Sequence, residues 1–418
     1  MNPQAYIEEI ASAARAAAAE LAVTRGQKRD QALRACAQAI RNGACDLQVA
    51  NGKDLARSDE LGLTDAMVDR LRLTDARIES MAAALEQIAA QTDPMGQTLA
   101  AYNRPNGLRI EKRRVPIGVI GIIYESRPNV TADAAGLCLK SGNACILRGG
   151  KEAIHSNLAI AKVLRRAIAE AGLPEALVTM IDDPDRAIVP AMAQAEGKID
   201  LIIPRGGETL IRAVAQAATI PVIKHYAGIC HVYVHADADL EMAAAIVLNA
   251  KCQRPAVCNA METLLVDSAV AEAFVPNVAR QLIEAGVELR GCERTRKLCG
   301  DIKAADEDDW SAEYLDLIAA VKIVDGLAAA INHINTHGSR HTDAIVTRSI
   351  AAAEAFVAGV DSSSVMVNAS TRFSDGGEYG LGAEVGISTD KLHARGPMGA
   401  EDLTTYKWIV TGDGHVRQ

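Results

Sequence analysis

Short apolar runs that alternate with helical patterns place the strongest constraint on how this chain folds. The runs lie at residues 115–124, 144–147, 177–181, 199–203 and 222–223, with helical periodicity between them. Strands that are apolar on both faces and alternate with helices predict a parallel sheet covered by helices on both sides. This doubly wound arrangement often supports nucleotides. We therefore expect a cofactor-binding domain over these residues.

A second series of apolar runs predicts another α/β domain farther along the chain. These runs lie at residues 230–234, 263–266, 320–324, 343–346 and 365–367, again with helical stretches between them. The boundary between the two domains is expected near Gly228. A length of 418 residues is enough for two to three domains, each with its own core.

Charge and cysteine usage exclude several classes of protein. The chain has 53 acidic and 44 basic residues, a formal charge of −9, which argues against nucleic-acid binding. No apolar run approaches the roughly 18 residues that span a bilayer, and residues 1–9 lack a signal-peptide core. The nine cysteines form no Cys-x-x-Cys pair, so neither a disulfide framework nor a zinc site is indicated. We expect a cytoplasmic protein with reduced thiols, no bound metal and no membrane contact.

The first hundred residues and one charged strand complete the expected organisation. The first hundred residues are rich in alanine at helical spacing and are punctuated by glycines and Pro94, which predicts several packed helices. Residues 108–116 alternate apolar and charged side chains, a pattern typical of a half-exposed strand. The free edge of such a strand can pair with another chain.

Cys258 lies where a fixed and reachable thiol is expected. An amphipathic stretch at residues 239–251 leads into a loop that contains Pro255, and a buried-strand pattern follows the loop. The loop is thus held between two regular elements. A cysteine is more often a small buried hydrophobe, and the residues alone leave that alternative open. We take Cys258 as the candidate nucleophile.

Two glycine pairs follow predicted strands and precede helices. The first strand contains Gly118 and Gly121, which do not have the spacing of the dinucleotide fingerprint. Two later turns suit phosphate better, because glycine permits close backbone approach and a helix start favours anions. The cations in the first of these turns would favour NADP over NAD. Ordinary helix caps and tight turns remain the alternative. The two turns consist of Arg148, Gly149, Gly150 and Lys151, and of Arg205, Gly206 and Gly207.

Several long strings of residues resemble the aldehyde dehydrogenase superfamily, and the resemblance covers nearly the whole chain. The most specific strings lie at 124–131, 367–373 and 392–399, beside 117–143, 148–152 and the Cys258 loop. The resemblance implies an α/β fold with two doubly wound domains and a small β-arm for oligomerisation. It assigns 1–105 and 117–227 to an NADP-binding domain with N-terminal helices. It assigns 228–400 to the catalytic domain and 106–116 with 401–418 to the arm.

The resemblance also implies roles for individual residues. Cys258 matches the superfamily nucleophile. The Arg148 turn matches the contact with the adenine ribose, the Arg205 turn matches the helix start that faces phosphate, and Glu313 lies near the carboxylate that binds the nicotinamide ribose. His225 lies 33 residues before Cys258 (258 − 225), where hydrolytic members have a water-activating glutamate. A residual histidine at this position either takes part in catalysis or only hydrogen-bonds in the core.

The resemblance is most specific to members that reduce an acyl phosphate. It implies NADPH-dependent reduction of L-glutamyl 5-phosphate to L-glutamate 5-semialdehyde and phosphate, through a thioester on Cys258, in proline synthesis from glutamate. Loss of the glutamate base fits this reaction, because an activated water would hydrolyse the thioester and release the acyl group as a free acid. Arginines can hold the substrate's anionic groups, and small polar side chains can add hydrogen bonds, although each could equally form a surface salt bridge or a turn. The candidate substrate-binding residues are Ser126, Arg127, Asn368, Ser370, Arg372 and Arg395.

The sequence leaves two other functions open. One is an NAD-dependent aldehyde dehydrogenase that releases a free carboxylic acid. The other is a non-catalytic oligomeric relative, because a fold alone does not establish function. In each case we expect a homo-oligomer that binds small molecules.

Overall fold

The computed structural model describes residues 2–300 and 302–417, and these divide into two compact units. Unit 1 takes in the described residues up to Lys224, then Gly380–Ile387, and those from Leu392 onward. Unit 2 takes in His225–Tyr379 and Ser388–Lys391. The chain therefore leaves unit 1 twice and returns to it twice.

The packing units and the functional domains inferred from sequence are divided differently near the end of the chain. Residues 380–387 and 392–400 pack with unit 1, because Val385, Ala394 and Met398 are buried in its core. From sequence, these residues were expected to belong to the Cys258 domain. The functional assignment of the domains itself stays a prediction.

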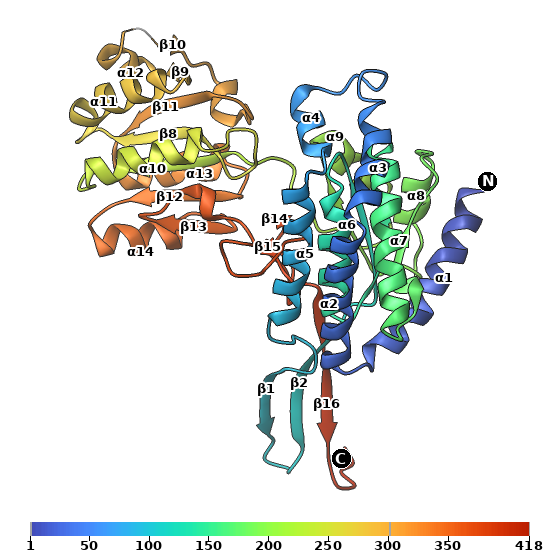
Figure 1. The fold of residues 1–418 in the computed structure, drawn as a ribbon. Coiled ribbons are helices and arrows are strands. Elements are labelled where there is room, and N and C mark those ends of the chain that lie inside the picture. Colours follow the sequence, from blue (N-terminus) through green and yellow to red (C-terminus); the bar gives the residue numbers. More distant parts are fainter. Residues whose placement is uncertain (1, 301, 418) are drawn as a thin grey trace. The chain divides into compact units, whose positions relative to one another are not determined.

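A parallel sheet with strand order β5-β4-β3-β6 forms the centre of unit 1 (Figure 1). Every predicted run of the first series contributes to it, and Val222 adds an isolated parallel bridge to Ile202. The run at 115–124 is divided at Gly118, whose φ is 132°, so that residues 115 and 116 end a separate strand. The four strands are β3 (Val119–Tyr124), β4 (Ala144–Arg148), β5 (Val178–Met180) and β6 (Leu201–Arg205).

Two groups of helices pack on this sheet. In one group α2, α5, α6 and α7 contact one another, and in the other α1 packs on α8, which contacts α9. This arrangement confirms the doubly wound fold predicted for the chain. The helices are α1 (Pro3–Ala22), α2 (Gly26–Asn42), α3 (Ala44–Leu55), α4 (Asp65–Leu71), α5 (Asp75–Ala90), α6 (Asn129–Lys140), α7 (Ile154–Glu170), α8 (Ile188–Ala193) and α9 (Glu208–Ala217), with short 3-10 turns η1 (Lys151–Ala153) and η2 (Glu175–Leu177).

Unit 2 is built on a longer parallel sheet with strand order β10-β9-β11-β8-β7-β12-β13. Successive side chains of a strand face opposite sides of a sheet. On β7, Val232 and Val234 pack in the cluster with α10 and α11, whereas Tyr233 packs with α13 and α14. Helices therefore cover both faces, as predicted.

The elements of unit 2 follow one another as alternating strands and helices. They are β7 (Cys230–Val234), α10 (Leu240–Cys252), β8 (Met261–Asp267), α11 (Ala271–Glu284), β9 (Glu288–Gly291), α12 (Glu293–Leu298), β10 (Lys303–Ala304), η3 (Asp308–Ser311), β11 (Ile318–Val324), α13 (Gly326–His337), β12 (Thr342–Val346), α14 (Ile350–Gly359), β13 (Ser364–Val367) and η4 (Thr371–Phe373). Two further short strands near the end of the chain, β14 (Gly386–Ser388) and β15 (Gly396–Met398), pair with each other.

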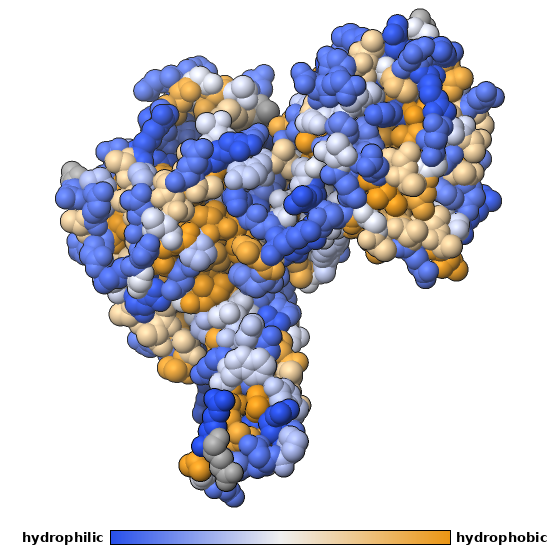
Figure 2. All heavy atoms as spheres, turned by 180° about the vertical axis from the view of Figure 1, so that it is seen from behind, coloured by the Kyte–Doolittle hydropathy of each residue, from blue (hydrophilic) through white to orange (hydrophobic). Residues whose placement is uncertain are grey.

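An antiparallel arm extends from unit 1 (Figure 1). Its strands are β1 (Thr98–Asn103), β2 (Arg109–Pro116) and β16 (Thr404–Thr411), in the order β1-β2-β16. The structure therefore contains the predicted charged strand and pairs it with the last strand of the chain. Figure 2 shows hydrophobic side chains among hydrophilic ones on the arm, at the bottom of the view. Among the described residues, no helix is both long enough and apolar enough to span a bilayer.

Candidate active site

Cys258 lies in the loop between α10 and β8, and its side chain is partly exposed. The helix before the loop is capped by Asp239, whose carboxylate accepts the backbone N–H groups of Glu241 and Met242. The strand after the loop is buried throughout. Both ends of the loop are thus fixed, as the sequence suggested, and the thiol stays reachable.

Two residues from another segment hold the backbone of Cys258. Gly228 lies so close that a Cβ added to it would collide with the carbonyl group of Cys258. Its N–H donates to Glu313 Oε1 at 2.7 Å. The thiol of Cys230 donates to the Cys258 carbonyl oxygen at 3.2 Å. Glu313, predicted to bind cofactor, therefore supports the segment that packs against the nucleophile.

Two histidines lie beside the thiol. Donor atoms of His225, Cys258 and His341 all lie within 4.8 Å of one another. The two imidazole rings meet edge to face, with centroids 5.5 Å apart. His341 is buried, and its Nδ1 lies 2.9 Å from the Thr342 hydroxyl. His225 lies beside Cys258, and a catalytic role for it stays a prediction. Sequence reasoning missed His341, because only the fold brings the start of β12 to the Cys258 loop.

A cation lies close to the thiol on a different loop. The guanidinium of Arg372, in η4, donates to Gln253 Oε1 at 2.8 Å and to Asn259 Oδ1. Burial and the charge of Arg254 lower the pKa of Arg372, while Cys258 acts in the opposite direction. Asn259 is buried and donates to the Ser374 carbonyl at 2.9 Å. Asn259, which the sequence analysis did not single out, thus ties the Cys258 loop to the Arg372 loop.

Asn368 and Ser370 shape the loop that carries Arg372. Asn368 has φ 55°, accepts the Thr347 N–H at 2.9 Å and donates to the Thr347 carbonyl at 2.9 Å. Ser370 is buried and accepts the Arg372 N–H at 3.3 Å. These bonds give both residues a structural role. A direct substrate contact for either stays a prediction.

A buried ion pair lies at the two ends of the Cys258 loop. Lys251 Nζ lies 2.7 Å from Glu262 Oε2, and both side chains are fully buried. The other oxygen of Glu262 accepts the N–H of Leu315, two residues beyond Glu313. Burial raises the pKa of Glu262 to about 7, against the opposing charge of Lys251. The pair joins the ends of the loop to the segment that holds Gly228.

The predicted cofactor turns lie at the carboxyl ends of the unit 1 strands. The chain runs from β3 to β4 and β5 in one direction, and β6 lies on the other side of β3. Ligands of open α/β sheets bind outside such a switch point. At the start of α9 the Gly207 N–H donates to the exposed Glu125 carboxylate at 2.9 Å, and a Cβ on Gly206 would collide with that carboxylate. This helix start already holds an anionic group, so it fits a cofactor phosphate that replaces Glu125.

The Arg148 turn, at the end of β4, carries the two cations. The guanidinium of Arg148 donates to the Pro184 carbonyl at 3.1 Å, and burial lowers its pKa. Lys151 is exposed at the start of η1. Within the turn, Gly149 and Gly150 pack closely against Asn157 and Glu152, respectively. The turn combines close backbone approach with positive charge, which fits a phosphorylated ribose.

The remaining predicted residues also belong to unit 1. Ser126 is buried with φ 44°, and both its N–H and its hydroxyl donate to Glu152 Oε1, at 2.7 and 2.9 Å. Arg127 and Arg395 are half-buried. Arg205 forms an ion pair with Glu384 at 3.3 Å. Contact of Ser126, Arg127 or Arg395 with a substrate held at Cys258 stays a prediction.

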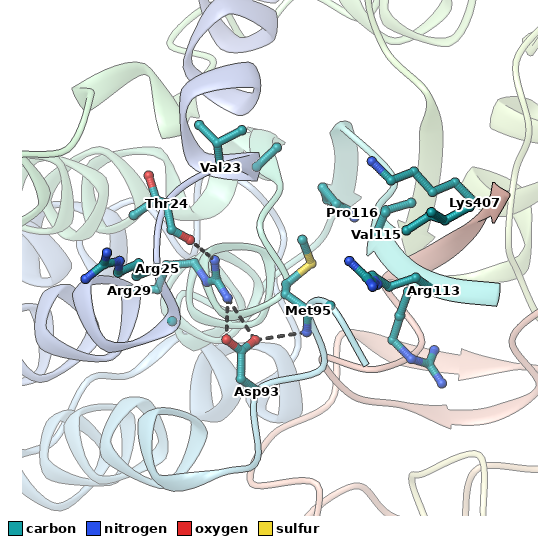
Figure 3. A pocket seen from close by; sticks show the side chains of 15 residues that line it. Val23, Thr24, Arg25, Arg29, Asp93, Met95, Arg113, Val115, Pro116 and Lys407 are labelled. Atoms are coloured by element: carbon teal, nitrogen blue, oxygen red, sulfur yellow. Dashed lines mark hydrogen bonds and ion pairs between the residues drawn. The ribbon is translucent and has the colours of Figure 1, made fainter. Parts of the chain in front are cut away.

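A cavity of about 630 Å³ lies at the base of the arm in unit 1 (Figure 3). In it, Asp93 accepts the guanidinium of Arg29 and the N–H of Met95, and the side chains of Arg113 and Lys407 lie across from them. None of the predicted site residues lines this cavity. All of its lining residues belong to unit 1, whereas Cys258 belongs to unit 2.

Comparison with known proteins places the chain among enzymes of one family. The sequence model of the Aldehyde dehydrogenase family matches residues 2–290. A protein of Geobacter metallireducens called Gamma-glutamyl phosphate reductase is 55% identical over 412 residues, 99% of each chain. A protein of Moorella thermoacetica with the same name is 52% identical over 418 residues, 100% of each chain.

A solved structure agrees with these relatives. The crystal structure of Gamma-glutamyl phosphate reductase from Thermotoga maritima has a TM-score of 0.96 and 44% identity, and the match covers 99% of this chain and 100% of that one. Likeness of sequence and of fold thus extends over nearly the full length of both chains. The chain therefore belongs to the aldehyde dehydrogenase family and, within it, to the gamma-glutamyl phosphate reductases.

Proposed function

We propose that this chain reduces L-glutamyl 5-phosphate to L-glutamate 5-semialdehyde and phosphate, the second step of proline synthesis from glutamate. The observation that carries the proposal is the full-length identity of 52 to 55% with relatives named Gamma-glutamyl phosphate reductase. The partly exposed thiol of Cys258 supports it, because a thiol readily attacks an acyl phosphate.

The reaction begins at sulfur. Cys258 Sγ attacks the γ-acyl carbon, the carbon–oxygen bond to phosphate breaks, and the thiol proton leaves with the departing phosphate or to water. A thioester on Cys258 results. When bound, the nicotinamide cofactor supplies the hydride that reduces this thioester to a thiohemiacetal. Collapse of the thiohemiacetal releases the aldehyde and returns the sulfur of Cys258 to its starting state.

Residues near Cys258 favour attack of phosphate, rather than attack of water, on the thioester. Position 225 carries a histidine rather than a carboxylate base, so no carboxylate there activates water. Arg372 lies in electrostatic range of Cys258, and its guanidinium suits an anionic group of the substrate. The exchange of the acyl group with phosphate, rather than its hydrolysis, is the outcome we expect.

NADP is the cofactor we propose within the nicotinamide class. Arg148 and Lys151 support this choice, because two cations at the end of β4 favour a 2′-phosphate. The cytoplasm is the compartment we propose. The nine cysteines are free, and the cytosol keeps thiols such as that of Cys258 reduced.

A homo-oligomer formed through the arm is also part of the proposal. All residues of β1 are exposed, and on β16 Tyr406, Trp408 and Val410 are about half exposed. An exposed strand edge with aromatic and aliphatic side chains favours pairing with a second copy. Light scattering of a Trp408→Glu variant tests this: a smaller particle than the unmodified protein supports the role of the arm, and an unchanged particle contradicts it.

The reaction is tested in its reverse direction. Glutamate 5-semialdehyde and NADP are supplied with and without phosphate, beside NAD and simple aliphatic aldehydes. We expect NADPH formation that requires phosphate, is lost in Cys258→Ala and persists in Cys45→Ala, the matched variant of an exposed cysteine in unit 1. Phosphate-independent release of glutamate would instead indicate a hydrolytic aldehyde dehydrogenase. A folded protein that neither turns over nor binds NADPH would indicate a non-catalytic relative.

A further inference from the structure

We infer that His225, Cys258 and His341 form a binding site for a thiophilic divalent cation, of which Zn²⁺ is the type, and that the bound ion reversibly blocks the nucleophile. One sulfur and two imidazole donors lie within 4.8 Å of one another. All three residues belong to unit 2, so the site lies within one compact body. The inference concerns the resting thiol and goes beyond the proposed reaction.

The spacing of the donors is close to that of a zinc site. Zinc binds sulfur at about 2.3 Å and nitrogen at about 2.0 to 2.1 Å, so donors around a tetrahedral ion lie roughly 3.3 to 3.6 Å apart. The present limit of 4.8 Å requires an inward shift of at most about 1.5 Å. His225 and Cys258 lie in loops, and both are only partly buried, so rotation of their side chains can supply this shift.

His341 is the fixed member of the site. Its side chain is fully buried just before β12, and its Nδ1 is 2.9 Å from the Thr342 hydroxyl. Metal-binding histidines commonly use one ring nitrogen for such an outer hydrogen bond, which orients the other nitrogen toward the ion. The ring of His341 is therefore held in place before any ion arrives.

The types of donor determine which ion binds. A thiolate with two imidazoles selects soft or borderline ions such as Zn²⁺ over Mg²⁺ or Ca²⁺, which prefer oxygen. Cys230 does not join the set, because its buried thiol donates to the Cys258 carbonyl at 3.2 Å and burial raises its pKa. Three protein donors leave a fourth position for water or for a phosphate oxygen.

Binding changes the chemistry of Cys258 in a defined way. A sulfur–zinc bond forms, the sulfur–hydrogen bond breaks, and one proton is released to solvent for each ion bound. No oxidant or reductant is involved. The sulfur lone pair that would attack the acyl carbon is then shared with the ion, so turnover stops until a chelator removes it.

Cobalt gives a readout that does not depend on activity. Chelator-treated full-length protein is titrated with Co²⁺, and the thiolate-to-cobalt charge-transfer absorption is recorded. We expect one ion per chain, displacement by Zn²⁺, and no band in Cys258→Ala. His341→Asn and His225→Asn should each weaken binding at least tenfold, whereas Cys45→Ser should bind as the unmodified protein does. If buried His341→Asn fails to fold, as thermal melting will show, His225→Asn decides.

The outcomes are separable from those of the proposed function. A missing band, a band that persists in Cys258→Ala, or unchanged affinity in the folded histidine variants would overturn the metal site. In the reductase assay Zn²⁺ should inhibit, and excess EDTA should restore the rate. Failure of that assay without zinc would contradict the reaction but leave the cobalt result standing.

Discussion

At the scale of single residues, the position of Cys258 depends on groups outside its own loop. Gly228 packs against its carbonyl, and Glu313 holds Gly228 through its N–H. Asn259 joins the loop to Arg372. Cys258 could be proposed from sequence because the chain around it predicts a loop between two regular elements and because it matches the superfamily nucleophile. The roles of Gly228, Asn259 and His341 could not, since each arises from contact between segments far apart in the chain.

Gly228→Ala should reduce activity strongly and leave most of the fold intact. The new Cβ would meet backbone atoms of Cys258, which cannot rotate away, so the thiol must move. A displacement of about 1 Å at a reacting group can cost on the order of 10² in rate. Steady-state kinetics should show kcat/KM reduced about 100-fold. Gly52→Ala in α3, where a Cβ meets nothing within 4 Å, is the matched control and should keep full activity.

Lys251→Met should destabilise the protein more at alkaline than at acid pH. Burial raises the pKa of Glu262 to about 7, above its pKa in the unfolded chain. The contribution of Glu262 to the free energy of unfolding is therefore complete below the unfolded pKa and is lost as pH rises through 7. Removing Lys251 leaves that carboxylate unpaired, at a cost of about 3 to 5 kcal/mol when it is charged.

Chemical denaturation of Lys251→Met near pH 8 and near pH 5 measures this difference. The double variant Lys251→Met/Glu262→Leu should recover much of the loss, because an apolar pair can replace a buried ion pair. Equal destabilisation of the single variant at both pH values would contradict this account.

At the scale of elements, burial decided which parts of the fold could be predicted. The runs that became β3, β7, β8 and β12 are mostly apolar and are buried on both faces, and each lies in the interior of its sheet. The sequence analysis missed β1, whose residues are all exposed, and β9, which contains two charged residues in four. An apolar pattern reports burial, so the exposed strand β1, which is fixed by pairing, leaves no such signal, and the charged residues of the half-buried β9 interrupt it.

One element is expected to make unit 2 sensitive to acid. His333 on α13 is buried, with its ring centroid 5.6 Å from that of His231 and its Nδ1 3.2 Å from Lys322 Nζ. Burial, then His231, Lys322 and His337, lower its pKa to about 2. Trp310 also packs on the ring, and His231 itself pairs with Asp343 at 2.8 Å. Because the pKa of His333 is lower in the folded state, His333 stabilises the fold at pH values above its unfolded pKa of about 6.5. This stabilisation is lost as pH falls toward 2.

His333→Gln should therefore flatten the loss of stability in acid. Between pH 6.5 and pH 4.5 the slope of unfolding free energy should fall by up to about 1.4 kcal/mol per pH unit, the value for one proton. Denaturant titrations at several pH values measure this slope. His393→Gln, which replaces an exposed histidine in unit 1, should leave it unchanged. A slope unaltered in His333→Gln would show that other groups control acid lability.

At the scale of the whole molecule, each unit has its own hydrophobic core. The unit 1 core includes Ile122 and Leu164, and that of unit 2 includes Val266 and Phe356. Alternating apolar runs were enough to predict two α/β bodies. These runs were not enough to assign residues 392–400 to unit 1. Short irregular segments have no periodicity that would indicate which unit they pack against.

Phe356→Ala should unfold unit 2 early without affecting the arm of unit 1. Phe356 is fully buried and stacks on Tyr233 with ring centroids 6.3 Å apart, so the cavity should cost about 3 to 5 kcal/mol. The two tryptophans serve as separate reporters, since Trp310 is buried in unit 2 and Trp408 lies in the arm. Fluorescence of single-tryptophan versions, made with Trp408→Phe or Trp310→Phe, follows each part. Equal shifts of both reporters would mean that the chain unfolds as one body.

The return of the chain to unit 1 after residue 391 bears on the order in which the two units can be completed during synthesis. Strand β2 stays without its β16 partner, and the unit 1 core without Leu403, until residues 403–411 have been synthesised. By then the stretch that forms most of unit 2 has already left the exit tunnel. The body that carries the nucleophile can therefore mature before unit 1 has received β16 and Leu403.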